Sequence, residues 1–231
     1  MRVFLLLCLT TFSCAQQPPP ADAPAQPFHG VAFDFDPRVD AHRPSYILSI
    51  NADGTGKYIE FPADIPNGPA ARPVFLTVSP ATLQRLMAPH DVVTHDAATG
   101  DCGTRHKGIA STGRKTLTFY DGDRSVSCVF DYSDDAKVED SSAAFQAIAE
   151  TLQFSDRLDH AHRFDRLGLD AQIDALVSEN AGGRAIELQN IGRTLQSIVD
   201  DDRVMERVRR KAARLLQYAA GTPPPTAANS R

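Results

Sequence analysis

"KTLTFYDGDRSVSCVFDY" (residues 115–132) has the clearest strand pattern of this 231-residue chain, because apolar and polar residues alternate on both sides of a short turn signal. Alternation of this kind predicts a β-strand with one buried face. An Asp-Gly pair between two such runs predicts a hairpin turn. The stretch therefore predicts an antiparallel β-hairpin in the middle of the chain.

Two registers of this hairpin agree with the alternation. A turn at residues 121–122 pairs Leu117 with Val126, and a turn at residues 122–123 pairs Leu117 with Cys128. Both registers keep the apolar side chains on one face of the hairpin, because the side-chain period of a strand is two residues. The buried face is therefore predicted more firmly than the pairing.

Further β-strands are predicted on the N-terminal side of the hairpin. "SYILSINADGTGKYIEF" (45–61) has two β-rich runs around an Asn/Asp/Gly cluster, and "RPVFLTV" (72–78) is another strand. Ser79 is a favourable N-cap and Pro80 suits the first helical position. A short helix is therefore predicted to begin there and to stop near Pro89.

After residue 139 the period of the apolar residues changes from two to that of a helix. Asp170 is predicted to cap one of the expected helices, and the acidic run 200–202 is predicted to begin the last one. The predicted fold class is α+β: antiparallel β-hairpins with a short helix, followed by a helical C-terminal region. The apolar stripes of the expected helices consist of Phe145, Ile148, Ala149 and Leu152, then Ile173, Leu176 and Val177, then Leu188, Ile191, Leu195 and Ile198, and finally Val204, Val208, Ala212 and Leu215.

The chain divides by composition into five segments. We expect a signal peptide (1–15), a Pro-rich linker (16–29), a β-rich domain with a disulfide bond (30–137), a helical region (138–220) and a disordered tail (221–231). The linker and the tail are rich in proline and poor in apolar residues. They cannot bury enough apolar surface to offset their ordering entropy.

The first fifteen residues, "MRVFLLLCLTTFSCA", have the layout of a secretory signal peptide: one basic residue, a short apolar run and then small residues. The apolar run is too short to span a bilayer as a permanent helix. Cleavage is expected after Ala15. Alternatively, cleavage before Cys14 would let this cysteine carry a lipid anchor, although Thr11 and Phe12 depart from the usual lipoprotein pattern. In both cases we expect an exported protein, in the periplasm or secreted.

The net charge of −5 gives the chain no electrostatic drive toward nucleic acid or an anionic membrane surface. No nucleic-acid partner is therefore expected, and contact with a membrane is expected only through the alternative lipid anchor on Cys14. No cofactor is expected either, because the sequence contains no dinucleotide fingerprint and no Walker loop.

Two cysteines remain after cleavage at Ala15, and an even pair in an exported chain predicts a disulfide bond. We therefore expect Cys102 and Cys128 to be joined. The alternative is a thiol nucleophile at Cys102 with His106 as its base, which needs a free thiolate. An oxidising compartment and a ready partner cysteine favour the disulfide.

The segment between residues 90 and 106 is the candidate functional loop. Histidine and aspartate side chains close together in sequence can form an acid–base pair or a zinc site. In a polar loop such side chains are more often solvated, so no catalytic residue and no metal site is assigned. The candidate residues of the loop are His95, Asp96, Asp101 and His106.

Four stretches of the chain carry a resemblance: "YILSINADGTGKYIEF", the span from Cys102 to Cys128, "HRFDRLGLDAQIDALV" and "LQSIVDDDRVMERVRRKAARLL". With these stretches the mature chain resembles a group of uncharacterised exported bacterial proteins, which have a hairpin-rich front half with two cysteines and a helical tail. The resemblance implies an α+β fold and an exported location. It carries over no activity and no ligand.

The sequence favours a non-catalytic binding or interaction module of the cell envelope, whose partner is expected to be another envelope protein or an envelope component. The export signal, the tether-like Pro-rich segment, the stapled β unit and the absence of a catalytic motif all motivate this expectation. The alternative is a periplasmic hydrolase that uses His and Asp residues of the 90–106 loop.

Overall fold

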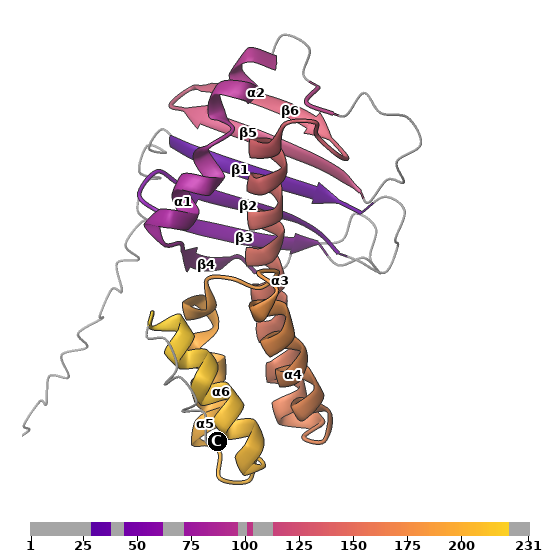
Figure 1. The fold of residues 1–231 in the computed structure, drawn as a ribbon, viewed down its shortest axis with the longest axis vertical. Coiled ribbons are helices and arrows are strands. Elements are labelled where there is room, and N and C mark those ends of the chain that lie inside the picture. Colours follow the sequence, from indigo (N-terminus) through magenta and orange to yellow (C-terminus); the bar gives the residue numbers. More distant parts are fainter. Residues whose placement is uncertain (1–28, 38–43, 62–71, 97–100, 104–112, 222–231) are drawn as a thin grey trace, which may run out of the picture.

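In the computed structural model the described chain forms a six-stranded antiparallel β-sheet, helices that cover one face of the sheet, and a helical lobe at the C-terminal end (Figure 1). The predicted α+β fold class is therefore confirmed. The predicted signal peptide, and most of the predicted linker and tail, lie outside the described residues. The structure describes residues 29–37, 44–61, 72–96, 101–103 and 113–221.

The strands follow the order β4-β3-β2-β1-β5-β6 across the sheet, and each neighbouring pair is antiparallel. The hairpins β2–β3 and β5–β6 therefore flank β1, which joins them. Within the described residues the strands are β1 (His29–Asp36), β2 (Ser45–Asn51), β3 (Thr55–Phe61), β4 (Val74–Thr77), β5 (Arg114–Asp121) and β6 (Arg124–Phe130).

The β5–β6 hairpin adopts the register with its turn at residues 122–123. Leu117 lies opposite Cys128, and both side chains are fully buried. The turn places Gly122 at its first central position with a φ of 62°, a left-handed conformation that glycine adopts without strain. The predicted buried face is confirmed, and the other register is excluded.

β1 is not among the individually predicted strands, yet it occupies the centre of the sheet. Its side chains alternate: Val31, Phe33 and Phe35 are buried, whereas Asp34 and Asp36 are exposed on the opposite face. This alternation is typical of a sheet with one buried and one solvated face.

The start of the first helix follows the prediction, whereas the residues after it do not. The Ser79 hydroxyl accepts a hydrogen bond from the Thr82 N–H (3.3 Å), and Pro80 is the first residue of the helix. The candidate loop then begins with a second short helix at His90. Val93 of this helix is fully buried in the core and anchors it there. Because the residues around Val93 are mostly polar, the sequence pattern does not indicate this burial.

The two first helices and the first half of the long third helix lie over one face of the sheet, which we call the inner face (Figure 1). The opposite face is the outer face. Within the described residues the helices are α1 (Pro80–Met87), α2 (His90–Asp96), α3 (Ala136–Phe164), α4 (Gly168–Ala181), the 3₁₀ helix η1 (Leu188–Ile191), α5 (Gly192–Asp200) and α6 (Glu206–Ala219).

Helix α3 connects the sheet to the helical lobe. It has 29 residues, which corresponds to a length of about 44 Å. In its first half Phe145 stacks on Phe33 of β1, with ring centroids 5.1 Å apart. In its second half Leu158 is fully buried. A single apolar cluster contains residues of both halves, so the core continues across residue 137, where the two predicted domains meet.

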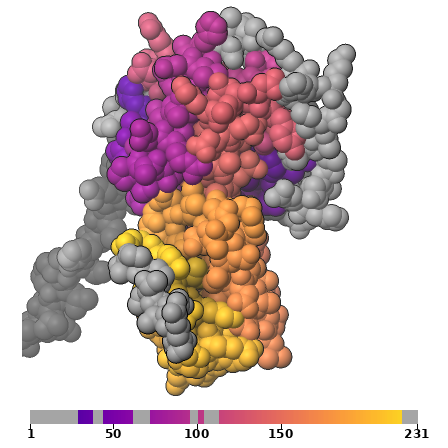
Figure 2. All heavy atoms as spheres, in the orientation of Figure 1, coloured from indigo at the N-terminus to yellow at the C-terminus, as the bar shows by residue number. Residues whose placement is uncertain are grey.

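The helical lobe consists of α4, η1, α5 and α6 packed around the second half of α3. Figure 2 shows it in orange and yellow, below the sheet and its covering helices. The predicted apolar stripes are buried there, except that Val177 is 39% exposed. No helix in the described part of the chain combines the length and the apolarity that a bilayer crossing needs.

Two helix starts differ from the prediction. α4 begins at Gly168, whose N–H donates to the Asp165 carboxylate (2.9 Å), so Asp170 lies inside the first turn instead of capping the helix. α6 begins at Glu206, because the acidic run 200–202 ends α5 and forms the turn after it.

Candidate functional site

The outer face of the sheet carries a hollow of about 1040 Å³. This volume is similar to that of the largest small-molecule sites, about 1,000 Å³. We call it the outer-face hollow. It lies over four strands and reaches η1 at the β4 edge of the sheet. The residues that line it are Ser49, Asn51, Thr55, Gly56, Lys57, Phe75, Leu76, Thr77, Tyr120, Gln189 and Asn190.

The strand register explains the shape of this hollow. Outward-facing residues align in rows across the strands, and one row runs from Phe75 on β4 through Lys57, Ser49 and Ala32 to Thr118 on β5. The small side chains of Ser49 and Ala32 lie between larger ones. The middle of the row is therefore lower than the end at β4.

In the next row Gly30 lies between Asn51 and Tyr120, and both of these flanking residues line the hollow. A Cβ atom at Gly30 would approach the Ile50 carbonyl oxygen to 2.1 Å. Close approach of the neighbouring backbone thus requires glycine here.

Three groups in the outer-face hollow are unengaged. The Ser49 hydroxyl, the Lys57 ammonium group and the Phe75 ring make no hydrogen bond, ion pair or ring contact with any described residue. Phe75 is also 78% exposed. By contrast, Asn51 Nδ2 donates to Thr55 Oγ1 (2.8 Å) and so holds the β2–β3 turn. The unengaged groups have no evident task in the folding of the sheet.

The β4 edge of the hollow is closed by two side-chain amides of η1. The Thr77 N–H donates to Asn190 Oδ1 (2.9 Å), and Asn190 Nδ2 donates back to the Thr77 carbonyl oxygen (2.9 Å). Gln189 Nε2 donates to the same carbonyl oxygen (3.2 Å). We call these contacts the amide clamp. They occupy the N–H and carbonyl oxygen of Thr77, which a further strand would otherwise bind.

Glu187 fixes the position of the amide clamp from the residue before η1. Its carboxylate accepts hydrogen bonds from the Ser79 N–H (3.0 Å) and the Ser79 hydroxyl (2.7 Å), at the start of α1. Burial would raise its pKa, but hydrogen bonds from Thr82, Gln189 and Ser79 outweigh burial and hold the pKa below its usual range. The residue has a φ of 59°, a conformation that costs a non-glycine residue about 1–2 kcal/mol.

The predicted disulfide bond between Cys102 and Cys128 is confirmed. Both cysteines are buried, and no thiolate is available at Cys102 in this oxidation state. Asp101 forms a parallel bridge with Val129 at the free edge of β6, and its carboxylate accepts from the Gly103 N–H (2.7 Å). The disulfide therefore holds residues beside the β6 edge.

The candidate residues of the 90–106 segment occupy different elements. His95 is exposed in the last turn of α2, and Asp101 is exposed beside β6. The side chain of Asp96, and all of His106 and Cys14, lie outside the described residues. In the described part of the chain, no three His, Cys, Asp or Glu side chains are arranged to hold a metal ion. The hydrolase built on this segment stays a prediction.

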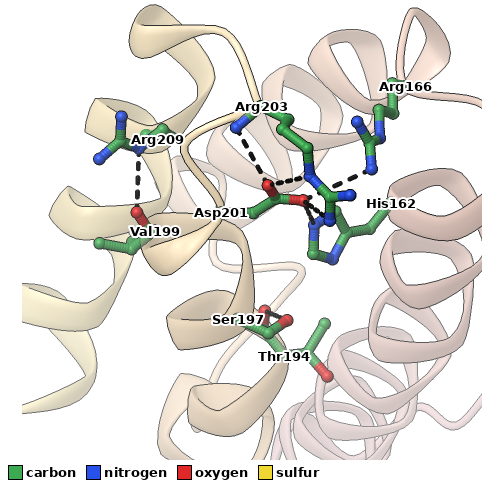
Figure 3. A network of polar contacts seen from close by, with 8 residues as sticks. All are labelled: His162, Arg166, Thr194, Ser197, Val199, Asp201, Arg203 and Arg209. Atoms are coloured by element: carbon green, nitrogen blue, oxygen red, sulfur yellow. Dashed lines mark hydrogen bonds and ion pairs between the residues drawn. The ribbon is translucent and has the colours of Figure 1, made fainter.

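A second polar cluster lies in the helical lobe (Figure 3). The Asp201 carboxylate accepts from Arg203 Nε (2.9 Å), while its other oxygen lies 3.0 Å from His162 Nε2 and 3.6 Å from Arg166. Hydrogen bonds from Arg203 hold the pKa of Asp201 well below its usual range. The cluster joins the end of α3 to the α5–α6 turn, and its charged groups satisfy one another. Its arrangement fits a structural role.

The sequence does not reveal the outer-face hollow or the amide clamp. Alternation within β3 and β4 places Lys57 and Phe75 on outward positions, but their alignment with Ser49 depends on the register between strands. No protein-family model matches the chain, and no curated protein matches it as a relative. What the protein binds is therefore inferred from its own residues.

Proposed function

We propose that the protein is an exported, non-catalytic binding module of the cell envelope, and that the outer-face hollow is its binding site. The observation that carries this proposal is the row of unengaged groups at Ser49, Lys57 and Phe75 inside the hollow. An exposed ring stabilises the free protein very little, whereas aromatic anchors supply much of the free energy of binding in interfaces. The row is therefore best explained by a ligand.

The chemistry of the lining supports binding more than catalysis. The described lining contains hydroxyls, amides, two aromatic rings and one lysine, but no histidine, carboxylate or thiol. General acid–base catalysis needs a titratable group within hydrogen-bond reach of the reacting atoms. Ser49 and Lys57 are cross-strand neighbours, yet no hydrogen bond joins their side chains in the described structure. The register alone does not make them a nucleophile and its base.

Export is supported by the N-terminal sequence and by the disulfide. The first fifteen residues have the layout of a signal peptide. The bond between Cys102 and Cys128 is of a kind that persists in oxidising compartments. The proposal holds for a protein that is free in the periplasm, for one that is secreted, and for one that is anchored to a membrane through Cys14.

The binding site can be tested with a photo-reactive benzoylphenylalanine at position 75 in the native host. Phe164, at the end of α3, is the matched control because it is 76% exposed and does not line the hollow. We expect cross-links to an envelope component from position 75 only, and we expect Lys57→Gln to reduce them. Equal capture from both positions, or none from position 75, would contradict the proposed site.

Export has its own test. Intact-mass analysis of the protein from the native host should find a mature chain that begins at Gln16, or a chain that begins at diacylglyceryl-Cys14. The first result means a released protein, and the second means a tethered one. A full-length chain that still begins at Met1 would contradict export.

A further inference from the structure

We infer that the ligand of the outer-face hollow is a glycan chain that carries carboxylate groups. The inference rests on the proposed function, because it names the ligand of that same site. Phe75, Lys57 and Ser49 present a ring, an ammonium group and a hydroxyl from three adjacent strands. No other described residue engages these three groups.

The spacing of the three groups fits sugar units. Adjacent strands lie about 4.8 Å apart, so the strand of Phe75 and the strand of Ser49 are separated by about 10 Å. A sugar ring has an apolar face of C–H groups, which an electron-rich aromatic face attracts, and a polar rim of hydroxyls. With its apolar face on Phe75, a sugar directs its rim and its neighbours toward Lys57 and Ser49.

The charge of the hollow favours an anionic glycan. Lys57 is the one ionic group of the described lining, and no carboxylate opposes it. Asp53, in the adjoining turn, lies outside the lining; it accepts hydrogen bonds from the Thr55 N–H (2.9 Å) and hydroxyl (2.6 Å) and keeps its negative charge. Lysine acts as a compact point charge, so it binds a carboxylate without the fixed bidentate geometry of arginine. The carboxylate of an acidic sugar matches this group.

A peptide fits the hollow less well. Addition of a peptide strand to β4 is blocked at Thr77, because the amide clamp occupies its N–H and carbonyl oxygen. Phe75 is 78% exposed, so it provides a flat platform and not the enclosed pocket that an apolar side chain needs. The other lining groups are mainly hydroxyls and amides, which match a hydroxyl-rich polymer.

The test is calorimetric titration of the full mature protein with four probes. Hexasaccharides of mannuronic acid and of galacturonic acid are the carboxylated glycans, and mannohexaose is the neutral one. Hexaglutamate supplies carboxylates without sugar rings. The variants Phe75→Ala and Lys57→Gln are compared with Phe164→Ala and Lys137→Gln, which alter an exposed ring and an exposed lysine away from the hollow.

We expect at least one carboxylated hexasaccharide to bind more tightly than mannohexaose and hexaglutamate. Phe75→Ala should weaken its binding about tenfold or more, as loss of an aromatic anchor does. Lys57→Gln should weaken it about threefold at low ionic strength and less at high ionic strength, because salt screens an exposed ion pair. The two control variants should leave the affinity unchanged.

Three results would overturn the inference: no binding of either acidic hexasaccharide, binding of mannohexaose that equals theirs and ignores Lys57→Gln, or binding of hexaglutamate that equals theirs. The cross-linking experiment at position 75 is independent of these three results. If those cross-links remain, the hollow is a binding site for another class of ligand. If they are also absent, the proposed function fails together with the inference.

Discussion

The two edges of the sheet are protected in different ways. At β6 the Cys102–Cys128 disulfide holds Asp101 beside the strand, and the two cysteines are 26 residues apart. At β4 the Asn190 amide pairs with Thr77, and these residues are 113 positions apart. Both devices cover backbone groups that would otherwise recruit another strand. One is covalent and local, whereas the other depends on the helical lobe being in place.

The proposed binding site lies at the non-covalent edge. Gln189 and Asn190 hold β4 and also line the outer-face hollow. The position of the helical lobe and the shape of the hollow are therefore set by the same contacts. Among the described residues of the β6 edge, Asp101, Cys102 and Cys128 do not line the hollow.

Removal of the disulfide at the β6 edge should destabilise the protein most. Cys128→Ser should lower the free energy of unfolding by about 3.5 kcal/mol under oxidising conditions, because the open chain gains loop entropy when unfolded. Urea unfolding with and without reductant measures this difference. The wild type should lose most of its advantage in reductant. An equal deficit of the variant in both conditions would mean that the serine disturbs packing instead.

Removal of the non-covalent cover should have a smaller effect. Asn190→Ala deletes the two hydrogen bonds to Thr77 and should lower the free energy of unfolding by about 2 kcal/mol. Hydrogen exchange at the Thr77 amide should also become faster, while exchange at the β6 edge stays the same. Gln189→Ala, which removes one bond to the Thr77 carbonyl, is the graded control. Unchanged exchange at Thr77 would contradict the clamp.

The stability of the β4 edge should depend on pH through the Glu187 carboxylate. The folded state lowers the pKa of Glu187 below its ordinary 4.5, so its charged form stabilises the fold above that value. This contribution is lost as the pH falls below 4.5 and through the lower folded-state pKa. Glu187→Gln should destabilise the protein by about 1 kcal/mol at neutral pH. The difference between wild type and variant should shrink in acid, whereas a constant difference would exclude this role.

Substitutions in the row of Ser49, Lys57 and Phe75 should change stability least. Phe75→Ala and Lys57→Gln should change the free energy of unfolding by less than about 0.5 kcal/mol, because exposed side chains without partners contribute little to stability. Thermal and urea unfolding of both variants provide the measurement. A larger loss would give the row a structural role and would remove the main reason to place a ligand there.

Much of the fold follows from local sequence. Alternation predicts the β5–β6 hairpin, the Ser79-Pro80 pair predicts the start of α1, and the cysteine count predicts the disulfide. Each of these features depends on residues that are close in sequence or on a pairing with one solution. The central strand β1 is not predicted, because the alternate aspartates at positions 34 and 36 are as typical of a polar loop as of the solvated face of a strand.

The candidate site depends on relations that a single sequence does not contain. Predicting the row through Ser49, Lys57 and Phe75 requires the register of three strands. Alternation does not fix that register, because a shift of two residues keeps the same side chains on the same face. The amide clamp needs the helical lobe to return to β4. Nothing near Asn190 in sequence marks it as the partner of Thr77.

The distance between Asn190 and Thr77 also sets a delay during synthesis. A chain that grows at about 5–20 residues per second adds the 113 intervening residues in roughly 6–23 s. The second cysteine follows the first by 26 residues, or roughly 1–5 s at the same rate. Throughout the longer interval the Thr77 backbone groups lack the side-chain amide that binds them in the folded protein. The clamp at β4 therefore forms only after residue 190 has been added and the helical lobe has folded against Thr77.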